Sequence, residues 1–271
     1  MKTFIAPNFD LKETLFSAQF FYFKEIKDWF YIVNGNQIFK IKQENETLLY
    51  EGIEENELIK FFSLGFDYEK FKEKVTDGNI KKAIDKFLGI RLIKADFWQT
   101  LISFVCSSAA NFSKIRMNVE LLAEFFGRRI IFDGREFFLF PEIGEINNLD
   151  LITQAKTGYR SKYILAINQK PFEFFEDFFD LDYKQAKQKL MELSGIGSKV
   201  ADCICLFGLG HKDSFPVDTW IKKAIETLYF DGKIMNVKKI EEFVQQKFEH
   251  EKGLQQQYLF HYIRTTKNKT F

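Results

Sequence analysis

A lysine and an aspartate stand at two predicted helix starts within one stretch, "LSGIGSKVADCICLFGLGHKDSFPVD" (193–218). Lys199 follows a glycine-rich turn, where the positive end of the helix dipole favours a neutral, nucleophilic amine. Asp218 stands where an aspartate commonly caps a helix. Because one helix and one loop separate them, both can face one cleft as a nucleophile and electrostatic-base pair. Taken singly, Lys199 is also explained as a surface charge and Asp218 as a simple cap.

The glycines of the same stretch suggest a second kind of chemistry, the binding of a phosphate. Gly195 and Gly197 permit backbone conformations and close approaches that a β-carbon would block. The amides near Gly195, Gly197 and Val200 would then be free at a helix N-terminus, which favours an anion. A plain glycine-rich connection is the more common explanation of "GIG" on its own, because short glycine motifs are weak signals.

The elements that must position these residues are helices. "DYKQAKQKLMEL" and "KVADCICLFGLG" flank the glycine turn, which predicts a helix-hairpin-helix over about residues 183–208. "DFWQTLISFVCSS" begins at a capping aspartate, Asp96, and is apolar nearly all round, so a buried central helix is expected. "FSKIRMNVELLAEFFG" is amphipathic and ends at Gly127, a helix stop.

The first fifty or so residues predict an antiparallel sheet. Runs such as "QFFYFKE" and "WFYIVNGNQIFKIKQ" are dense in aromatic and β-branched residues, and two of them flank the Asn34-Gly35 pair, a hairpin signature. From "ENELIKFF" onward the apolar period shifts towards 3.6, so helices should close the sheet. We therefore expect an α+β fold. An antiparallel sheet domain with flanking helices (residues 1–80) should pack on a mostly helical region (81–271), with the boundary near Asp77-Gly78-Asn79.

Composition excludes several classes of protein. The 271 residues are 46% hydrophobic and 28% charged, which fits a folded chain with a sizeable core. No stretch approaches the roughly 18 apolar residues of a membrane span, and the N-terminus lacks the apolar run of a signal peptide, so a cytoplasmic location is expected. Three cysteines and three scattered histidines indicate no metal site. Residues 1–80 carry 10 Lys/Arg against 14 Asp/Glu, and residues 81–271 carry 29 against 24, so an anionic partner should dock on the second part.

The stretch that holds both candidate residues resembles the glycine-proline-aspartate helix-hairpin-helix DNA glycosylases, and within them the 8-oxoguanine DNA glycosylase family. "KVADC" and "PVD" carry this resemblance most specifically. It extends over almost the whole chain. "GIRLIKADFWQTLISFVCSSAANFSKI" resembles the family's DNA-entering segment, "KTGYRSKYI" its helical link, "SAQFFYF" its N-terminal segment and "LQQQYLFHYIR" its final helix. The chain lacks the four-cysteine motif of the iron–sulfur glycosylases, and Lys199 sets it apart from the monofunctional ones.

The resemblance implies a bifunctional enzyme that excises 8-oxoguanine from duplex DNA and cleaves the abasic site, without a cofactor. Lys199 would attack C1′ and form a Schiff base that permits β-elimination, and Asp218 would stabilise the developing oxocarbenium charge. The damaged base would leave the stack and enter a pocket. The implied pocket residues are Cys203 and Phe260 on the two purine faces, Gln256 at its Watson–Crick edge, Phe207, and Ala18, whose carbonyl would accept from the N7 hydrogen that guanine lacks. Core packing is the plain alternative for the Cys and Phe side chains.

The residues that would face the opposite strand depart from the family pattern. In "CSSAANFSK", Ala109 and Ala110 replace two asparagines of the family's eukaryotic members, Asn111 remains, and Lys114 stands where those members have an arginine. The aromatic wedge and its following arginine, Tyr159 and Arg160, are present. Alanine cannot donate to a base edge and lysine cannot make arginine's bidentate contact. We therefore expect a weakened preference for cytosine opposite the lesion.

The implied partner is double-stranded DNA containing oxidised guanine, bound by a monomer and away from any membrane. Two other interpretations are open from the sequence. One is a non-catalytic helix-hairpin-helix DNA-binding protein that grips phosphate only. The other is a helical protein in which "GIG" is structural and the 34 phenylalanines form the core. The coincidence of Lys199 and Asp218 favours the enzyme, because a simple hairpin binder needs neither.

Overall fold

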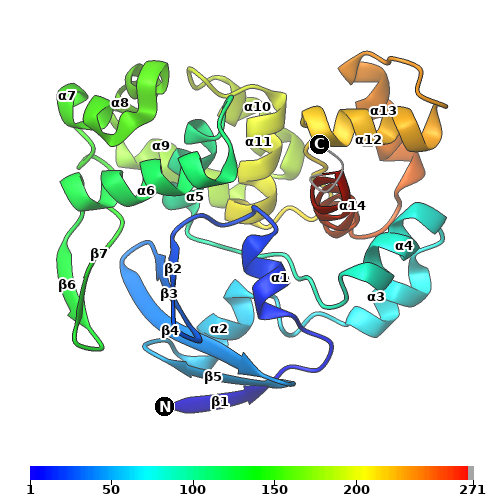
Figure 1. The fold of residues 1–271 in the computed structure, drawn as a ribbon. Helices are drawn as coiled ribbons and strands as arrows, with labels where there is room; N and C mark the ends of the chain where they lie inside the picture. The colour runs from blue at the N-terminus through cyan, green and yellow to red at the C-terminus, as the bar shows by residue number, and fades with distance from the viewer. Residues whose placement is uncertain (268–271) are drawn as a thin grey trace.

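The protein begins with a five-stranded antiparallel sheet, as predicted (Figure 1). This computed structural model describes residues 1–267. The strands lie in the order β1-β5-β4-β3-β2 and span β1 (Lys2–Ile5), β2 (Phe23–Ile26), β3 (Trp29–Asn34), β4 (Gln37–Glu44) and β5 (Thr47–Glu51). The β3–β4 turn lies one residue later than predicted. Asn34 is the last residue of β3 and pairs with Gln37, so the turn is Gly35-Asn36, and Gly35 takes the left-handed φ of 59° that such a turn needs.

This hairpin turn fixes the sheet against the first helix of the site. The backbone N–H of Gly35 donates to Gln99 Oε1 (2.7 Å), and Gln99 Nε2 donates to the carbonyl of Val33 (2.9 Å). Gln99 belongs to α5 (Phe97–Cys106), which begins at the predicted cap, Asp96. All residues of α5 are buried, as its apolar sequence predicts.

Helices make up most of the remaining chain, and most of them lie on one side of the sheet, above it in Figure 1. The helical part near the sheet comprises α1 (Leu11–Phe16), α2 (Glu55–Phe61), α3 (Tyr68–Lys74) and α4 (Gly78–Lys86). Asp77 caps α4, so the expected boundary at 77–79 coincides with a helix start, and α4 packs against the last helix, α14 (Lys252–Lys267). The division of the chain at residue 80 stays a prediction.

The central part of the chain adds a second, small sheet between helices. This part of the chain comprises α6 (Phe112–Phe126), the two-stranded hairpin β6 (Arg129–Phe132) and β7 (Arg135–Phe138), α7 (Leu149–Ile152), α8 (Ser161–Asn168) and α9 (Phe172–Glu176). Helix α6 ends at Gly127, as predicted. A β-carbon on Gly127 would lie 1.9 Å from the Leu139 carbonyl oxygen, which explains a glycine here.

The predicted helix-hairpin-helix is present as α10 (Tyr183–Met191) and α11 (Ser198–Ile204). Two further helices follow, α12 (Thr219–Tyr229) and α13 (Val237–Lys247). The hairpin turn packs on α8: Gly195 has a φ of 87°, and a β-carbon there would meet Tyr163 Cδ2 at 2.5 Å. Gly197 has an ordinary φ of −94°, and a β-carbon on it would meet no atom within 4 Å. The two glycines of "GIG" therefore differ: Gly195 is needed by the fold, whereas Gly197 is not.

This difference predicts the stability of two variants. We expect Gly195→Ala to lower the free energy of unfolding by about 2 kcal/mol, because alanine is strained at positive φ and its methyl group meets Tyr163. For a chain of this size that corresponds to a Tm lower by roughly 4–8 °C. Gly197→Ala is the matched control, and it should lower the free energy of unfolding by less than about half as much. Equal losses in a thermal unfolding experiment would contradict this assignment.

The core is one continuous cluster of buried apolar side chains that runs from the sheet into the helices. Edge-to-face and stacked rings are frequent in it, for example Phe20 against Phe61 at 5.3 Å and Phe104 on Phe207 at 5.6 Å. Within residues 1–267, no helix is both long enough and apolar enough to cross a membrane.

Candidate active site

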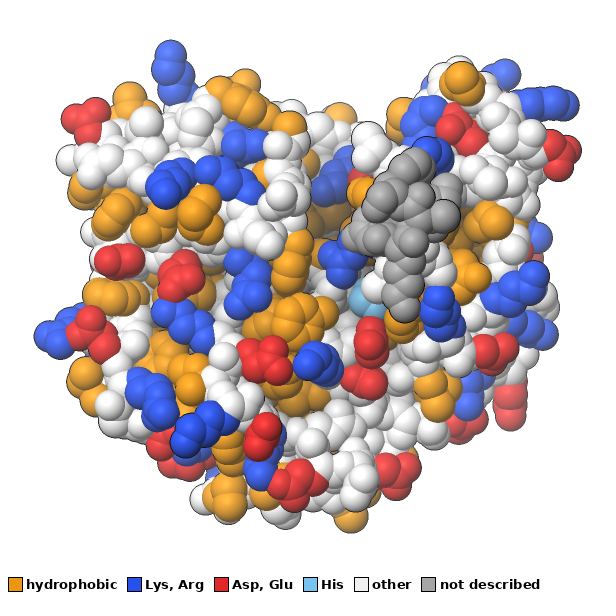
Figure 2. All heavy atoms as spheres, in the orientation of Figure 1, with side chains coloured by type: hydrophobic (Ala, Val, Ile, Leu, Met, Phe, Trp, Pro, Cys, Tyr) orange, Lys and Arg blue, Asp and Glu red, His pale blue; other side chains and the backbone are white. Residues whose placement is uncertain are grey.

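A cavity of about 1210 Å³ opens between α1 with the loop that follows it, the segment joining α5 to α6, the hairpin, the start of α12 and the last helix. In Figure 2 this face is hollowed between α6–α8 at the upper left and α12–α13 at the upper right. Lys and Arg side chains lie beside the hollow. Its volume is somewhat larger than the roughly 300–1,000 Å³ of typical ligand pockets. The lining comes from five separated segments, within 12–21, 104–115, 195–200, 217–220 and 260–265.

Lys199 lines this cavity from the first turn of α11. Its side chain is half-buried, and Nζ lies 3.4 Å from Ser107 Oγ and 5.5 Å from the centre of the Phe104 ring. Both neighbours belong to the α5 end of the cavity. The amine therefore lies at the cavity wall, and its role as a nucleophile stays a prediction.

Asp218 lines the same cavity and caps α12, as predicted. Its Oδ1 accepts from the backbone N–H of Ile221 at 2.7 Å. Burial raises the pKa of Asp218, while the Ile221 hydrogen bond and the charge of Lys199 act in the opposite direction. One carboxylate oxygen therefore caps the helix. The side chain also lines the cavity, where its charge interacts with that of Lys199.

The hairpin turn presents three backbone donors beside the lysine: within residues 1–267, the N–H groups of Gly195, Gly197 and Val200 donate to no acceptor. Gly195, Gly197 and Val200 all line the cavity. Gly197 is the N-cap of α11 and has no side chain to satisfy the first N–H groups of the helix. Backbone N–H groups at a helix start favour an anion, so phosphate binding at this turn stays a prediction.

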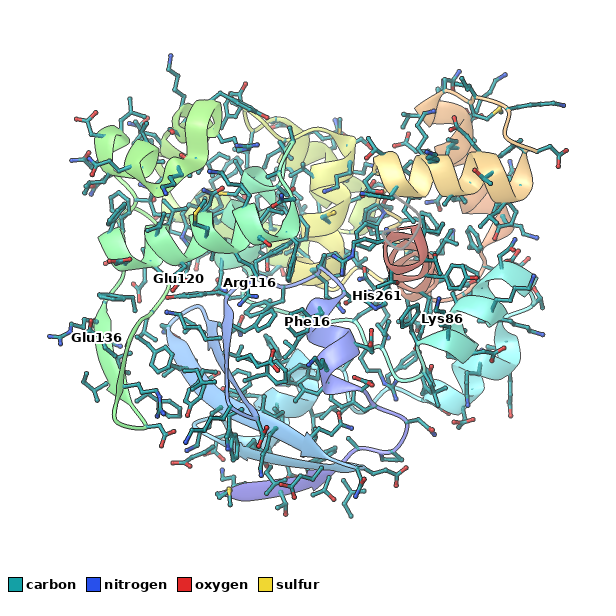
Figure 3. The ribbon with its side chains drawn as sticks, viewed as in Figure 1. Phe16, Lys86, Arg116, Glu120, Glu136 and His261 are labelled. Atoms are coloured by element: carbon teal, nitrogen blue, oxygen red, sulfur yellow. The ribbon has the colours of Figure 1, made fainter. Side chains whose placement is uncertain are left out.

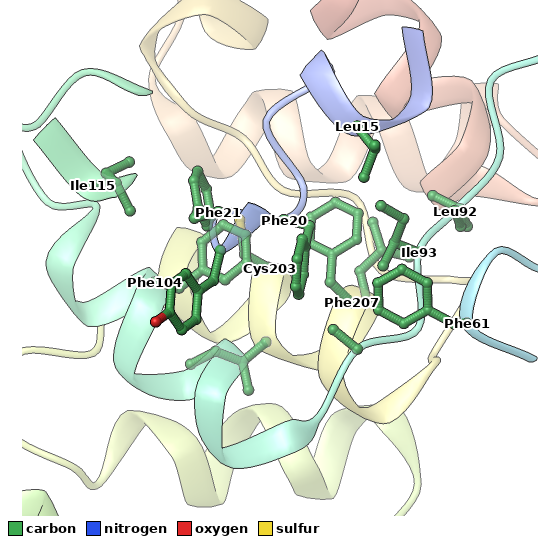
Figure 4. Close-up of a cluster of buried hydrophobic side chains, with 14 of the residues drawn as sticks. Leu15, Phe20, Phe21, Phe61, Leu92, Ile93, Phe104, Ile115, Cys203 and Phe207 are labelled. Carbon is green, nitrogen blue, oxygen red and sulfur yellow. The ribbon is translucent and has the colours of Figure 1, made fainter. Parts of the chain in front are cut away.

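The implied base-pocket residues divide into two groups. Ala18 and Phe260 line the cavity. Cys203, Phe207 and Gln256 do not: they are 4%, 3% and 4% exposed and lie behind the cavity wall. Figure 4 shows Cys203 and Phe207 in the buried cluster with Phe20, Phe21 and Phe104. A role for these three in base binding stays a prediction.

Two of the buried side chains still have suitable chemistry. Gln256 Nε2 donates to the Pro216 carbonyl at 3.1 Å, whereas its Oε1 is buried without a hydrogen-bond partner in the described part of the chain. An acceptor left unpaired inside a protein is costly and is consistent with a donor supplied by a ligand. Burial raises the pKa of the Cys203 thiol to about 12, so it is neutral and does not compete with Lys199 as a nucleophile.

The residues expected to face the opposite strand are partly used by the fold. Asn111 caps α6, accepting from the Lys114 backbone N–H at 2.9 Å. Arg160 is 6% exposed, and its guanidinium donates to the carbonyls of Ser108 and Thr157. Tyr159 is 58% exposed, as a wedge side chain must be. Asn111 lines the cavity, whereas Lys114, Tyr159 and Arg160 do not.

Several residues that the sequence does not predict also line the cavity. Phe104 and Phe21 form an apolar wall beside Lys199, and Phe207 stacks on Phe104 (interplanar angle 15°). "DFWQTLISFVCSS" gives no signal that separates the ring facing the cavity from its buried neighbours, because nearly every position is apolar. Glu13 and His261 also line the cavity, and Figure 3 shows His261 on α14 across from Phe16 on α1. His261 Nε2 lies 2.6 Å from Glu13 Oε2, and this contact joins residues 248 apart in sequence. In the part of the chain that is described, no group of three His, Cys, Asp or Glu side chains is placed to hold a metal ion.

Known proteins resemble the chain in sequence and in fold. Residues 3–101 match the family model of the N-terminal domain of 8-oxoguanine DNA glycosylase. A probable N-glycosylase/DNA lyase of Methanothermobacter thermautotrophicus is 29% identical over 227 residues, which cover 75% of this chain and 72% of that protein.

Two solved structures extend the similarity to nearly the full length. MBOgg1, in complex with a low-affinity DNA ligand, has a TM-score of 0.91 and 31% identity, with 98% of this chain and 100% of that chain covered. The 8-oxoguanine glycosylase/lyase of Clostridium acetobutylicum, in complex with double-stranded DNA containing cytosine opposite 8-oxoguanine, has a TM-score of 0.90 and 25% identity over 98% and 99% of the two chains. With its helix-hairpin-helix and its lysine and aspartate in one cavity, the chain belongs to the 8-oxoguanine DNA glycosylase family.

Proposed function

We propose that the protein is a bifunctional DNA repair enzyme that excises 8-oxoguanine from duplex DNA and cleaves the abasic site it leaves. The observation that carries this proposal is that Lys199 and Asp218, from two different helix starts, line one cavity beside the backbone amides of the hairpin turn. A protein that only grips phosphate needs neither side chain, so the non-catalytic alternative is not favoured.

The chemistry begins at Lys199. Its neutral amine attacks C1′ of the flipped nucleotide, the N-glycosidic bond breaks, and the base leaves with a proton. The second amine proton passes to O4′ as the C1′–O4′ bond breaks, which opens the sugar and gives a Schiff base between Nζ and C1′. Removal of a C2′ proton then breaks the C3′–O bond, and water releases the lysine. The half-buried position of Nζ beside Ser107 and Phe104 keeps the amine close to the sugar and limits competing water.

Asp218 supplies the negative charge that this reaction needs. The sugar acquires oxocarbenium character as the base leaves, and a buried carboxylate stabilises that charge more strongly than an exposed one. The Ile221 hydrogen bond fixes the carboxylate at the start of α12, so its orientation does not have to be established during the reaction.

The lesion is distinguished from guanine by donors and acceptors around the purine. The carbonyl of Ala18 accepts from N7–H, which guanine lacks, and Gln256 Oε1 accepts from the Watson–Crick edge. Among the described residues, the Ala18 carbonyl has no hydrogen-bond partner, and Gln256 Oε1 has none either. Phe260 covers one purine face, and Cys203 covers the other once the cavity wall adjusts.

The proposed activity is tested directly by its products. The protein is incubated with a duplex containing one 8-oxoguanine opposite cytosine, and with the same duplex containing guanine. We expect free 8-oxoguanine and a strand break with a β-elimination end from the first duplex only. Tight binding without release of a base would support the non-catalytic alternative instead. The monomeric state and the cytoplasmic location, or nucleoid association in a bacterium, stay predictions.

The opposite-base preference gives a further expected result. Ala109 and Ala110 offer no side-chain donor, and Arg160 already donates to two backbone carbonyls. Single-turnover excision rates with the lesion opposite C, A, G and T should therefore fall within about one order of magnitude, since one lost bidentate contact is worth about 1–3 kcal/mol of discrimination. A near-exclusive preference for C would contradict this expectation.

A further inference from the structure

The loop between α1 and β2 holds Ala18 in a strained conformation at the cavity wall. Ala18 has a φ of 64°, in the left-handed region that favours glycine, and a non-glycine residue there costs about 1–2 kcal/mol. Such a conformation persists only where neighbouring contacts hold it. Since the Ala18 carbonyl is the acceptor proposed to read the lesion, the contacts that hold this loop affect recognition.

One face of α14 provides these contacts. Gln257 Nε2 donates to the carbonyl of Ser17 at 2.5 Å, and the Arg264 guanidinium donates to the carbonyl of Phe16. Between them, His261 Nε2 lies 2.6 Å from Glu13 Oε2 on α1. The three side chains follow one another at spacings of four and three residues, which is one face of a helix. They bind the loop from α1 to the residue before Ala18.

The same helix carries the other proposed base contacts. Gln256 and Phe260 stand next to Gln257 and His261 in sequence, on the neighbouring face of α14. Gln257 is 2% exposed, so its amide bonds the loop in a place shielded from water, where a hydrogen bond is held tightly. A single rigid helix therefore sets the distance between the Ala18 carbonyl and the groups that bind the rest of the purine.

We infer that Gln257 is a positioning residue for lesion recognition. By fixing the peptide between Ser17 and Ala18, it aims the Ala18 carbonyl at N7 of the purine that Gln256 and Phe260 hold. An 8-oxoguanine donates its N7–H to that oxygen, whereas guanine opposes it with a lone pair. This inference rests on the proposed function and goes beyond it by naming a buried residue that does not line the cavity.

The test uses Gln257→Met, which keeps the length of the side chain and removes the donor. Gln255→Met is the matched control: Gln255 is 5% exposed, on the same helix, and its Nε2 also donates to a backbone carbonyl, that of His250, which lies outside the loop. Three quantities are measured on the full-length protein: single-turnover excision of 8-oxoguanine, cleavage of a preformed abasic site, and the ratio of the Kd values for guanine and 8-oxoguanine duplexes.

We expect Gln257→Met to slow excision by roughly 10- to 100-fold and to narrow the Kd ratio by about tenfold, as for one lost hydrogen bond to the base. Abasic-site cleavage needs no base contact and should stay within about threefold of wild type, and Gln255→Met should leave all three quantities within the same margin. Equal losses of excision and abasic-site cleavage, or no loss of either, would overturn the inference.

Two further outcomes separate this inference from the proposed function. If the wild-type protein excises no 8-oxoguanine, the proposed function fails and the inference falls with it. If wild type excises the base and Gln257→Met does so at the same rate, only the inference fails. Should Gln257→Met not fold, Gln257→Asn, which is shorter by one methylene and keeps the amide, is measured against the same criteria.

Discussion

Lys199→Gln is expected to lower the single-turnover rate of 8-oxoguanine excision by about 10⁴- to 10⁶-fold, the range seen when an enzyme loses its nucleophile. Glutamine keeps the length and polarity of the side chain but has no amine to form a Schiff base. The contacts that Lys199 makes in the free protein are weak, a 3.4 Å approach to Ser107 Oγ and a ring contact, so stability should change little. The Kd for an 8-oxoguanine duplex should stay within about tenfold.

Lys184→Gln is the control for this result. Lys184 is the second residue of α10, as Lys199 is of α11, and it lies exposed and outside the cavity. Its loss removes one positive charge from an equivalent helix position without touching the proposed chemistry, so wild-type rates are expected. Substantial excision by Lys199→Gln, above about a hundredth of the wild-type rate, would mean that another group displaces the base.

Asp218→Asn is expected to slow excision by about 10²- to 10³-fold with little change in DNA binding. Asparagine caps a helix about as well as aspartate, so the hydrogen bond from the Ile221 N–H and the start of α12 are retained. The variant therefore removes the charge that faces the sugar without removing the structural contact.

Asp182→Asn is the control that separates helix capping from stabilisation of the sugar's positive charge. Asp182 caps α10 and accepts from the Gln185 N–H at 2.9 Å, but it does not line the cavity. Both variants should unfold at similar temperatures, whereas only Asp218→Asn should lose activity. If the lower excision rate of Asp218→Asn were fully explained by a lower stability of the variant, Asp218 would act only as a helix cap.

The pH dependence of excision offers an independent check on Asp218. Its pKa is raised, chiefly by burial, above the value of about 3.9 for an exposed aspartate. The carboxylate acts in its ionised form, so the rate should be retained above this raised pKa and fall as the pH drops through it. The residual excision rate of Asp218→Asn should not show this fall at low pH.

Local sequence signals were sufficient for the elements that carry the site. Asp96 and Asp218 are predictable as helix caps because an aspartate before an apolar run satisfies free N–H groups of its own helix, and both do so. Gly127 ends α6 as predicted, since this requirement is also local. The β3–β4 turn was displaced by one residue because Asn34 pairs with Gln37 and its side chain accepts from the Asp96 N–H, a contact across 62 residues.

The walls of the cavity could not be predicted in this way. Phe104 is one of ten consecutive buried residues, and only the packing of α5 against Phe21 and Phe207 decides that its ring faces Lys199. The bond from Gln257 to Ser17 joins residues 240 apart, and no periodicity contains it. The resemblance to a family gave positions for the base pocket, yet the structure places Cys203, Phe207 and Gln256 behind the cavity wall.

The central claim is that the Lys199 amine forms a covalent bond with C1′ of the damaged nucleotide. Incubation with an 8-oxoguanine duplex and borohydride reduces such a Schiff base to a stable amine, and mass spectrometry of the digested adduct identifies the modified residue. We expect one DNA strand per protein molecule, attached at Lys199 and absent from Lys199→Gln. An adduct at another residue, or release of 8-oxoguanine with no trapped adduct, would contradict the claim.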